Sequence, residues 1–441
     1  MRQSQPRGGD SRAGRAVTSR FFYGWVILLV AGLCYGFGMP PVYYSWGIFA
    51  PRITAELGID RAAVGGVFGL FNTLHQCVGL LVGLAIARFG LRRVMPAGFC
   101  VTAAGLLVLA GADTARACYV GFSVLGGIGV GFSTTVPAQT LGQNWFLRRR
   151  ARVIGAIFTV GGLVGWLVSR SDTWVLERYD WRTGWVLIAA LSVVLGLVAA
   201  SLVREGPEAV GQRVDGEAPA TGDGPSGGEA EPADRWTAWQ AARTPQFALM
   251  LVCGVAYAVP WNTAVAHLTL HLIDRGHAET MAIGFVGTMA LVSIAGRLAG
   301  AVGDWIAPQR ALAAALVLEG LGAGALVLAG STVVAWVAVT LLGVGFGMAF
   351  VCIPVVFSHF FGRRAFAVTS GIRTTCTGIF GGLGPWLAGG AFDATGSYAI
   401  PFLGLLVLGL AGGAAAAALR RPGVPPAGGG GEPEVRQASA P

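Results

Sequence analysis

The feature that most constrains this chain is a series of long apolar stretches. About 20 apolar residues are enough for a helix to cross the hydrocarbon core of a bilayer. Stretches near this length or longer occur six times before residue 204 and six times after residue 243. The sequence therefore predicts an all-α membrane protein with twelve transmembrane helices in two groups of six. The stretches lie near residues 22–49, 62–87, 94–111, 117–141, 153–175 and 183–203, and then near 247–273, 281–303, 311–329, 333–357, 367–392 and 397–419.

The composition supports a membrane protein and excludes other classes. Apolar residues make up 54% of the chain and charged residues only 12%, which is far from the composition of a soluble domain. The net charge of +9 comes from 31 basic residues, all of them arginines. They lie in the segments between apolar stretches, so they report orientation in the membrane, and we expect no nucleic-acid partner. The seven cysteines show neither metal-ligand spacing nor a disulfide framework, and we expect no metal site.

Three segments are too polar to form a core. Residues 1–20 are rich in arginine, glycine and serine and lack the apolar core of a signal peptide. Residues 204–243 and 420–441 are rich in glycine and proline and contain few apolar residues. The sequence therefore predicts two disordered tails and a central linker. The two six-helix bundles are expected at 21–203 and 244–419.

The arginines indicate which side of the membrane each loop occupies. Both tails, the linker and the loops that contain Arg92 and Arg149 are rich in arginine and fall on one side. Loops on the other side contain fewer arginines, and acids accompany them, as Asp274 accompanies Arg275. By the positive-inside rule, both termini and the linker are cytoplasmic. We expect a multi-pass protein of the cell's inner membrane.

The two halves of the chain repeat each other. Gly-Val-Gly-Phe at residues 129–132 recurs at 343–346, and each copy is followed by a proline. These glycine-rich strings lie inside apolar stretches and no Gly-Lys-Ser/Thr follows them, so they are not a nucleotide-binding loop. A duplicated six-helix bundle is typical of transporters whose halves rock around a site near the membrane midplane.

Arg297 is the charge that most needs an explanation. It lies seven residues before Asp304 in an apolar stretch, so at 1.5 Å per residue it is roughly 10 Å inside the membrane. Burying a guanidinium there costs several kcal/mol, and arginine cannot give up its proton. We expect Arg297 to bind an anionic substrate. The alternative is an arginine that backbone carbonyls or a neighbouring helix satisfy.

Several motifs resemble one known family. Residues 83–93 are similar to the G-x-L-x-D-R-x-G-x-R-R cytoplasmic signature of the major facilitator superfamily. Four further motifs resemble monocarboxylate-transporter-like members and bacterial oxalate–formate exchangers. The resemblance covers nearly the whole chain outside the tails and linker. It implies the major facilitator fold, with two pseudo-symmetric six-helix bundles, and transport of a small organic anion, above all a monocarboxylate. The four motifs are Tyr23-Gly24-Trp25, Trp145-Phe146, Trp181-Arg182 and residues 393–398.

The resemblance also assigns roles to single positions. Arg297 matches the eighth-helix arginine that binds the substrate carboxylate in these relatives, and Arg373 is the natural substitute for an eleventh-helix lysine of the exchangers. Tyr43 stands where monocarboxylate transporters use a first-helix lysine. Ser293 replaces the aspartate one turn before the arginine and cannot ionise. We therefore expect anion exchange, or proton coupling that is weaker or differently wired than in the family's proton symporters.

Other polar side chains in the apolar stretches are candidates from their position alone. Tyr35 and Asn262 are expected to line the pocket. His267 is a candidate substrate-binding or titrating group, although a histidine in a helix bundle is more often a packed hydrogen-bonding residue. Glu319 is a carboxylate near the midplane, and hence a possible proton carrier, on a helix that is peripheral in this fold.

Two sets of residues are expected to control access to the site. The family signature and its repeat place a cytoplasmic gate at Gly83, Arg88, Gly300 and Asp304; the aspartate of the signature is missing from the first half. Near the opposite surface, the alternatives for Arg170 and Asp172 are a local pair and a part in the outer gate.

These observations favour a monomeric secondary transporter that works by alternating access. Its partners are a small organic anion, lipid and, in one alternative, protons. We expect no enzymatic activity and no cofactor, because the sequence contains no ATPase motif and no catalytic triad. Two alternatives stay open. In the same fold, the chain exports drugs or natural products and Arg297 is structural. In another class, it is a non-transporting membrane receptor or scaffold.

Overall fold

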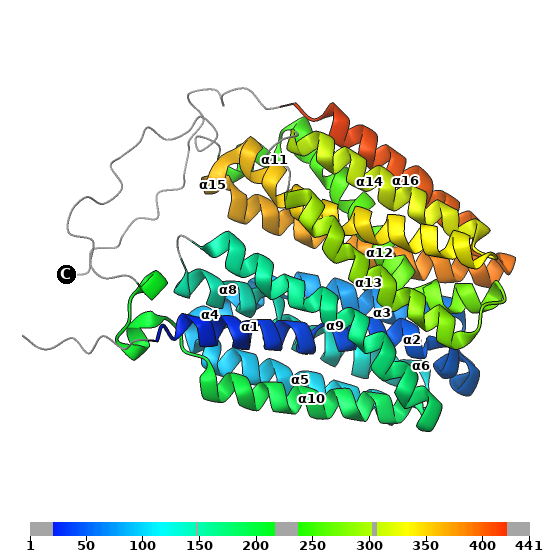
Figure 1. Cartoon of the computed structure of the whole chain (residues 1–441), viewed down its shortest axis with the longest axis horizontal. Coiled ribbons are helices and arrows are strands. Elements are labelled where there is room, and N and C mark those ends of the chain that lie inside the picture. Colours follow the sequence, from blue (N-terminus) through cyan, green and yellow to red (C-terminus); the bar gives the residue numbers. More distant parts are fainter. Residues whose placement is uncertain (1–20, 147–148, 217–236, 302–306, 421–441) are drawn as a thin grey trace, which may run out of the picture.

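The computed structural model describes residues 21–146, 149–216, 237–301 and 307–420. Within these ranges the chain forms helices joined by short turns (Figure 1). The predicted tails, the middle of the linker and Asp304 lie outside the described residues. The described helices form two bundles, α1–α10 and α12–α16, which lie side by side.

In the first bundle, three of the predicted membrane crossings consist of more than one helix. The first breaks at Met39, directly before Pro40 and Pro41, as the two prolines predict. The second bends by 49° between α3 and α4. The fourth contains a π-helical segment, η1. The helices are α1 (Gly24–Gly38), α2 (Pro40–Leu57), α3 (Arg61–Cys77), α4 (Gly79–Phe89), α5 (Leu91–Ala110), α6 (Ala115–Cys118), η1 (Tyr119–Gly126), α7 (Gly127–Ser133), α8 (Thr135–Trp145), α9 (Arg150–Arg178) and α10 (Trp181–Leu202).

The second bundle follows two short 3₁₀ turns and a short helix. The turns are η2 (Pro207–Val210) and η3 (Val214–Gly216), and the short helix is α11 (Ala238–Ala242). The bundle itself consists of α12 (Pro245–Asp274), α13 (Glu279–Ala301), α14 (Pro308–Ala325), the 3₁₀ turn η6 (Leu326–Leu328), α15 (Thr332–Thr395) and α16 (Ala399–Ala418).

The helical segment α15 contains two membrane crossings. Its 64 residues would extend for about 96 Å if straight, about three times the thickness of a bilayer core. The guanidinium of Arg373 lies 5.8 Å from the ring centroid of Phe357, although 16 residues separate them and a straight helix would place them about 24 Å apart. The segment therefore doubles back between these residues, at the end of the molecule where Figure 1 labels it.

The number of crossings agrees with the predicted fold class. Ten helices of the described chain are long and apolar enough to span a membrane, and the bent pair α3–α4 is an eleventh candidate. The second leg of α15 supplies the remaining crossing. The described residues thus form an all-α membrane protein with twelve crossings in two bundles, the architecture that the apolar stretches predict.

Glycines bring α15 against two helices of its own bundle. A Cβ atom on Gly343 would lie 2.6 Å from a backbone oxygen of α13, and one on Gly347 would lie 1.9 Å from another. A Cβ atom on Gly345 would lie 2.5 Å from a backbone nitrogen of α14. Real Cβ atoms do not approach backbone so closely, so the contacts require glycine, as is common where membrane helices pack tightly.

The same pattern in the first bundle corrects the register of the repeat. Gly127 and Gly131 face α3 and the residue that follows it, whereas Gly129 faces α5, with a Cβ position 2.5 Å from a backbone nitrogen. The equivalent segments are therefore 127–131 and 343–347. The alignment of the two Gly-Val-Gly-Phe strings is two residues out of register, because alternating glycines do not reveal which of them faces which helix.

The two bundles touch most closely along α3 and the second leg of α15. A Cβ atom on Gly69 would lie 2.0 Å from the carbonyl oxygen of Gly382, and one on Gly65 would lie 2.1 Å from that of Pro385. A Cβ atom on Gly389 would lie 2.1 Å from the carbonyl oxygen of Arg61, at the start of α3. We call this end of the molecule, with the α2–α3 and α12–α13 turns, the closed end, and the opposite end, where α10 leads into the linker, the linker end.

The first part of the predicted linker is docked on the first bundle. Glu205 accepts hydrogen bonds from the backbone N–H groups of Leu91 and Arg92 at 3.1 and 3.2 Å, and so caps α5. Gln212 accepts from the backbone N–H of Tyr23 at 2.9 Å. The structured part of the first bundle therefore extends beyond residue 203, because these two polar side chains satisfy backbone groups that a helix end leaves free.

Two glycines of the signature differ in backbone conformation and in the space around them. Substitution by alanine should therefore destabilise the protein to different extents at the two positions. Gly90 has φ of +78°, and a Cβ atom there would lie 2.4 Å from Glu205 Oε1, whereas Gly83 is helical and has nothing within 4 Å. Gly90→Ala should lower the free energy of unfolding by about 1–3 kcal/mol. Gly83→Ala should change it by about 0.5 kcal/mol or less. Thermal unfolding in detergent measures both; equal effects would contradict the strained-turn assignment.

Candidate functional site

Arg297 lies at the interface between the two bundles. The close packing of α13 on α15 holds its backbone in place, since a Cβ atom on Gly347 would lie 3.0 Å from its amide nitrogen. Its Nη1 donates a hydrogen bond of 2.6 Å to the carbonyl oxygen of Phe158, on α9 of the other bundle. The guanidinium carbon lies 4.9 Å from the ring centroid of Phe350. Its buried Nε has no hydrogen-bond partner among the described residues.

Tyrosines from both bundles interact electrostatically with this guanidinium. Tyr35 and Tyr44 of the first bundle and Tyr257 of the second all interact electrostatically with Arg297. Tyr35 also packs edge-on against Phe158, with ring centroids 4.7 Å apart. Within the described ranges, no acidic side chain forms an ion pair with Arg297. The site thus offers one cation, phenol hydroxyls and aromatic faces, with one guanidinium N–H uncommitted.

A stack of aromatic rings forms one wall beside the arginine. Trp261 of α12 stacks on Phe346 of α15 with ring centroids 3.6 Å apart, and Tyr257 stacks on the same ring at 4.9 Å. Phe346 and Phe350 lie one turn apart on α15, with centroids separated by 6.4 Å. These rings give the wall a rigid apolar surface, which favours the short carbon skeleton of an organic ion over a fully hydrated inorganic one.

Arg373 lies near the same group of aromatic residues. It is half-buried on the second leg of α15, and Nη2 donates to the hydroxyl of Thr374 at 3.3 Å. Tyr257 interacts electrostatically with both Arg373 and Arg297. The two arginines that the sequence singled out therefore interact electrostatically with the same tyrosine, and in the described structure no acid pairs with Arg373 either.

Tyr43 and Asn262 form a bond between the bundles. The Tyr43 hydroxyl donates to Asn262 Oδ1, which joins α2 to α12. Their side chains are only 5% exposed each. Both residues thus lie at the bundle interface, and in this conformation their polar atoms are engaged with each other.

His267 does not lie beside Arg297. It is fully buried, Nε2 is 2.8 Å from the carbonyl oxygen of Pro385, and Nδ1 is 3.0 Å from the hydroxyl of Tyr398. It is ten residues, about 15 Å along α12, from Tyr257, which contacts the arginine site. Because both ring nitrogens are engaged in packing contacts, we leave His267 out of the proposed binding site.

The predicted gate residues fall into three situations. Gly83 and Arg88 are exposed on α4, and the guanidinium of Arg88 lies over the neighbouring ring of Phe89 at 5.5 Å. Gly300 is buried, and a Cβ atom there would meet Met348 of α15 at 3.1 Å. Asp304 lies outside the described residues. Gly83 and Gly300 therefore have unequal surroundings, one open and one packed within its own bundle.

Within the described residues, the ion pairs between the bundles lie at the closed end. Arg52 of α2 donates to both oxygens of Glu279 of α13, at 2.9 and 2.7 Å. Arg61 forms an ion pair with Asp274 at 3.2 Å. Asp393 of α15 accepts from the first two backbone N–H groups of α3, at 3.1 and 2.7 Å, and so caps a helix of the opposite bundle. These contacts hold the two bundles together on one side of Arg297.

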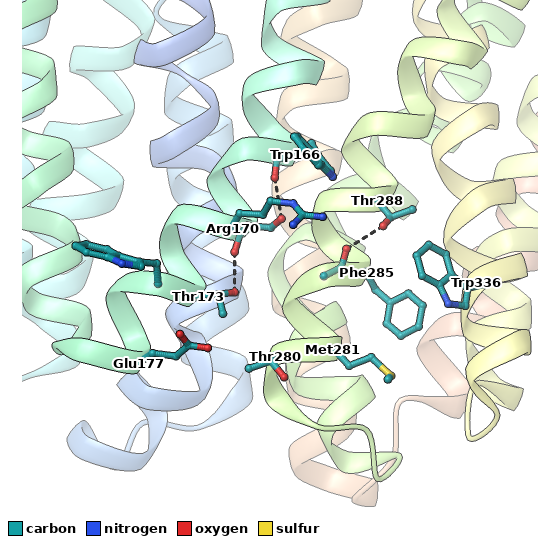
Figure 2. Close-up of a pocket in the computed structure, with 12 residues that line it drawn as sticks. Trp166, Arg170, Thr173, Glu177, Thr280, Met281, Phe285, Thr288 and Trp336 are labelled. Atoms are coloured by element: carbon teal, nitrogen blue, oxygen red, sulfur yellow. Dashed lines mark hydrogen bonds between the residues drawn. The ribbon is translucent and has the colours of Figure 1, made fainter.

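A groove of about 540 Å³ also lies at the closed end, between α9, α13 and α15 (Figure 2). Trp166, Trp174, Phe285 and Trp336 provide most of its aromatic lining. Its nearest lining residue on α13 is Thr288, nine residues or about 14 Å from Arg297. The groove is therefore separate from the arginine site.

The groove explains the position of Arg170. Its guanidinium points from α9 into the groove and lies 4.5 Å from the ring centroid of Trp166. Asp172, two positions later, is 4% exposed and buried inside the bundle. Residues two apart on a helix do not face each other. The expectation of a local Arg170–Asp172 pair is thus wrong, and each residue has its own environment.

Comparisons with known proteins agree with this architecture. A family model described as "Major Facilitator Superfamily" matches residues 28–385. Mouse monocarboxylate transporter 11 is 26% identical over 399 residues, which cover 86% of this chain and 84% of that protein. The Escherichia coli protein named "Uncharacterized MFS-type transporter YhjX" is 24% identical over 341 residues, 75% of this chain and 79% of that protein.

Other relatives match over a shorter length. Bovine monocarboxylate transporter 13 is 28% identical over 293 residues, 64% of this chain and 62% of that protein. Mouse monocarboxylate transporter 1 is 24% identical over 189 residues, 43% of this chain and 38% of that protein. For these two, the chain spans less than two thirds of the relative.

Solved structures share the fold at low sequence identity. The nucleoside transporter NupG superposes with a TM-score of 0.68 at 13% identity and covers 90% of this chain and 99% of its own. A bacterial homologue of the lysosomal transporter Spinster, in an inward-facing and occupied conformation, gives 0.67 at 16% identity, covering 90% and 96%. These likenesses concern the fold alone.

The aromatic part of the site was missed by sequence reasoning. Tyr257, Trp261, Phe346 and Phe350 lie in apolar stretches, where aromatic residues are common and carry no mark of function. The Gly-Val-Gly-Phe string that contains Phe346 gives no signal either, because its match to residues 129–132 is out of register in the structure.

The ion pairs at the closed end predict that reversing one charge will shift the conformation of the protein. The Arg52 and Glu279 side chains are 51% and 28% exposed, so solvent screening limits their pair to about 0–1 kcal/mol. Arg52→Glu should therefore increase the population with a separated closed end by about fivefold or less. Spin labels at Arg178 and Thr280, on the facing helices α9 and α13, would report this in double electron–electron resonance.

The control is the charge swap Arg52→Glu with Glu279→Arg, which should restore the original distance distribution. An unchanged distribution in the single variant would show that this ion pair does not bias the closed end.

Proposed function

Because the chain belongs to the Major Facilitator Superfamily, we propose that it is a secondary transporter of a small organic anion, above all a monocarboxylate, working by alternating access. The observation that carries the proposal is Arg297: an intramembrane guanidinium at the bundle interface, with a free Nε–H, tyrosines around it and no acid paired with it in the described structure. The relatives named monocarboxylate transporters support the same substrate class.

The proposed binding mode follows from the chemistry of these side chains. A carboxylate accepts two parallel hydrogen bonds from one guanidinium, which Arg297 provides from Nε and a terminal nitrogen. Arg373 adds a second positive charge beside Tyr257. The hydroxyls of Tyr35 and Tyr44 complete the polar side, and the stacked rings contact the carbon skeleton.

The proposed transport cycle moves the bundles about this site. Opening the closed end would break the Tyr43–Asn262 bond and the ion pairs beyond it. We place the gate of the opposite end at Gly83, Arg88 and Gly300, together with Asp304. The closed end is then the outer side of the inner membrane, with both termini and the linker in the cytoplasm, and the monomer is the working unit.

Arg297 has a partner even without an anion, and this bears on coupling. An empty carrier with an unpaired guanidinium would favour obligatory exchange, because moving that charge through a low-dielectric site is costly. Here the carbonyl of Phe158 accepts from Arg297 at 2.6 Å. The charge of Arg297 therefore does not require obligatory exchange, and the proposal is compatible with net transport of the anion.

The test is uptake of labelled carboxylates into proteoliposomes with Arg297 variants. Arg297→Lys should reduce uptake at least tenfold, since lysine keeps the charge but loses the planar two-pronged geometry, and Arg297→Gln should abolish it. The matched control is Arg170→Gln, which removes an intramembrane guanidinium outside the site and should retain most of the uptake.

The substrate panel separates the proposal from its alternative in the same fold. Short monocarboxylates, dicarboxylates and bulky uncharged aromatic compounds would be compared, because the stacked rings of Tyr257, Phe346 and Trp261 also suit a flat apolar compound. Near-wild-type uptake of monocarboxylates by Arg297→Gln, or transport of the uncharged compounds alone, would overturn the anion site.

A further inference from the structure

Glu319 is a carboxyl group that the proposed anion site does not use. It lies in α14, and its side chain is 0% exposed. Neither carboxyl oxygen has a hydrogen-bond partner among the described residues. An ionised carboxylate in such surroundings, at membrane depth, costs several kcal/mol, so it persists only when paired. In this conformation the Glu319 carboxyl therefore carries a proton.

The elements around Glu319 supply no ionic partner for it. Residues 332–351 of α15, all of α16 and the turn η6 contain no charged or titratable side chain. From α12, Tyr257 interacts electrostatically with Glu319, and Cys253, one turn earlier, donates its thiol to a carbonyl oxygen of α16. Neither group forms a hydrogen bond with Glu319.

The repeat shows that the fold does not require a carboxyl at this position. A Cβ atom on Gly345 would lie 2.5 Å from the backbone nitrogen of Glu319, and in the first bundle one on Gly129 would lie 2.5 Å from that of Thr102. Thr102 is the structural counterpart of Glu319. Its hydroxyl is also fully buried, but it satisfies itself by donating to the carbonyl oxygen of Gly98 at 3.0 Å. Where the first bundle has a hydroxyl that bonds to its own helix, the second bundle has a carboxyl group with no hydrogen-bond partner among the described residues.

Glu319 packs behind the aromatic wall of the anion site. Gly345, whose Cβ position lies 2.5 Å from the backbone nitrogen of Glu319, directly precedes Phe346, on which Tyr257 stacks. Tyr257 interacts electrostatically with Glu319, Arg297 and Arg373 alike. The charge of Glu319 therefore bears on an anion site that lies one layer of side chains away.

We propose that Glu319 is the proton-binding site of this transporter. One carboxylate oxygen of Glu319 takes a proton from water on one side of the membrane, carries it while the anion is bound, and releases it to water on the other side. This inference rests on the proposed function, because it gives the transported anion a co-transported proton.

The first measurement tests proton binding without any substrate. Infrared spectra of the full chain in liposomes would be recorded across a pH titration for wild type and Glu319→Gln. The wild type should show a protonated carboxyl band at neutral pH that the variant lacks. Identical spectra would mean that Glu319 is ionised and would overturn the proposal.

The second measurement tests coupling, with radiolabelled pyruvate as the probe. If one proton accompanies each pyruvate, a pH gradient of one unit should support about tenfold accumulation in wild-type proteoliposomes. Glu319→Gln should keep pyruvate counterflow within a few fold of wild type but accumulate no pyruvate above equilibrium. Glu319→Thr, which installs the side chain of Thr102, is the matched control for folding and should behave in the same way.

The outcomes separate this inference from the function on which it rests. Absence of pyruvate counterflow in the wild type would count against the monocarboxylate proposal. Counterflow without gradient-driven accumulation in the wild type, or accumulation that both Glu319 variants retain, would overturn the role of Glu319 while leaving the anion site intact.

Discussion

The structure depends above all on how the partly buried guanidinium of Arg297 finds hydrogen-bond partners inside the membrane. Arg297 cannot lose its charge, and its partner is a backbone carbonyl of the opposite bundle, at Phe158. A carbonyl cannot be removed by mutation or by protonation, so the empty carrier always has this bond available when the bundles are in this arrangement. Under the proposed function, the carboxylate would bind the uncommitted Nε–H of the same guanidinium. Anion binding and the relative position of the bundles would then be linked through one side chain.

The two bundles share their packing but differ in their charges. In each bundle, three alternating glycines allow close contacts between helices, at residues 127–131 and 343–347. At one equivalent position the first bundle carries Thr102, whose hydroxyl donates to its own helix, and the second carries Glu319, whose carboxyl has no hydrogen-bond partner among the described residues. The first bundle buries a different acid, Asp172, and the second also carries Arg297 and Arg373. Duplication thus supplies the scaffold, and the charged side chains inside the bundles are where the two halves differ.

The sequence was sufficient for the fold, but not for the direction in which each candidate side chain points. Apolar stretches predicted the crossings, and the structure places Arg297 at the interface between the bundles. Hydrophobic length carries no information about the angular position on a helix, so His267 was a candidate substrate-binding residue although it packs against Pro385 and Tyr398. The same limit hid Trp261 and Phe346, since aromatic rings in an apolar stretch look identical whether they face lipid or substrate. The family-like motifs turned out to hold helix ends together: Asp393 caps α3, and Trp181 and Arg182 both bond to Glu56.

The strength of the closed end decides how such a carrier can cycle. Its ion pairs are partly exposed and each contributes little, so they set direction and alignment more than stability. The close contact of α3 with α15 is of another kind: backbones touch at Gly69 and Gly382, and separating them exposes a continuous helix face. That face returns to lipid or to a water-filled cavity when the closed end opens. Since lipid is as apolar as the contact it replaces, the difference in free energy stays small. A transporter needs two states of similar free energy, and glycine contacts with weak polar ties provide a closed end that is specific in geometry yet easily reversed.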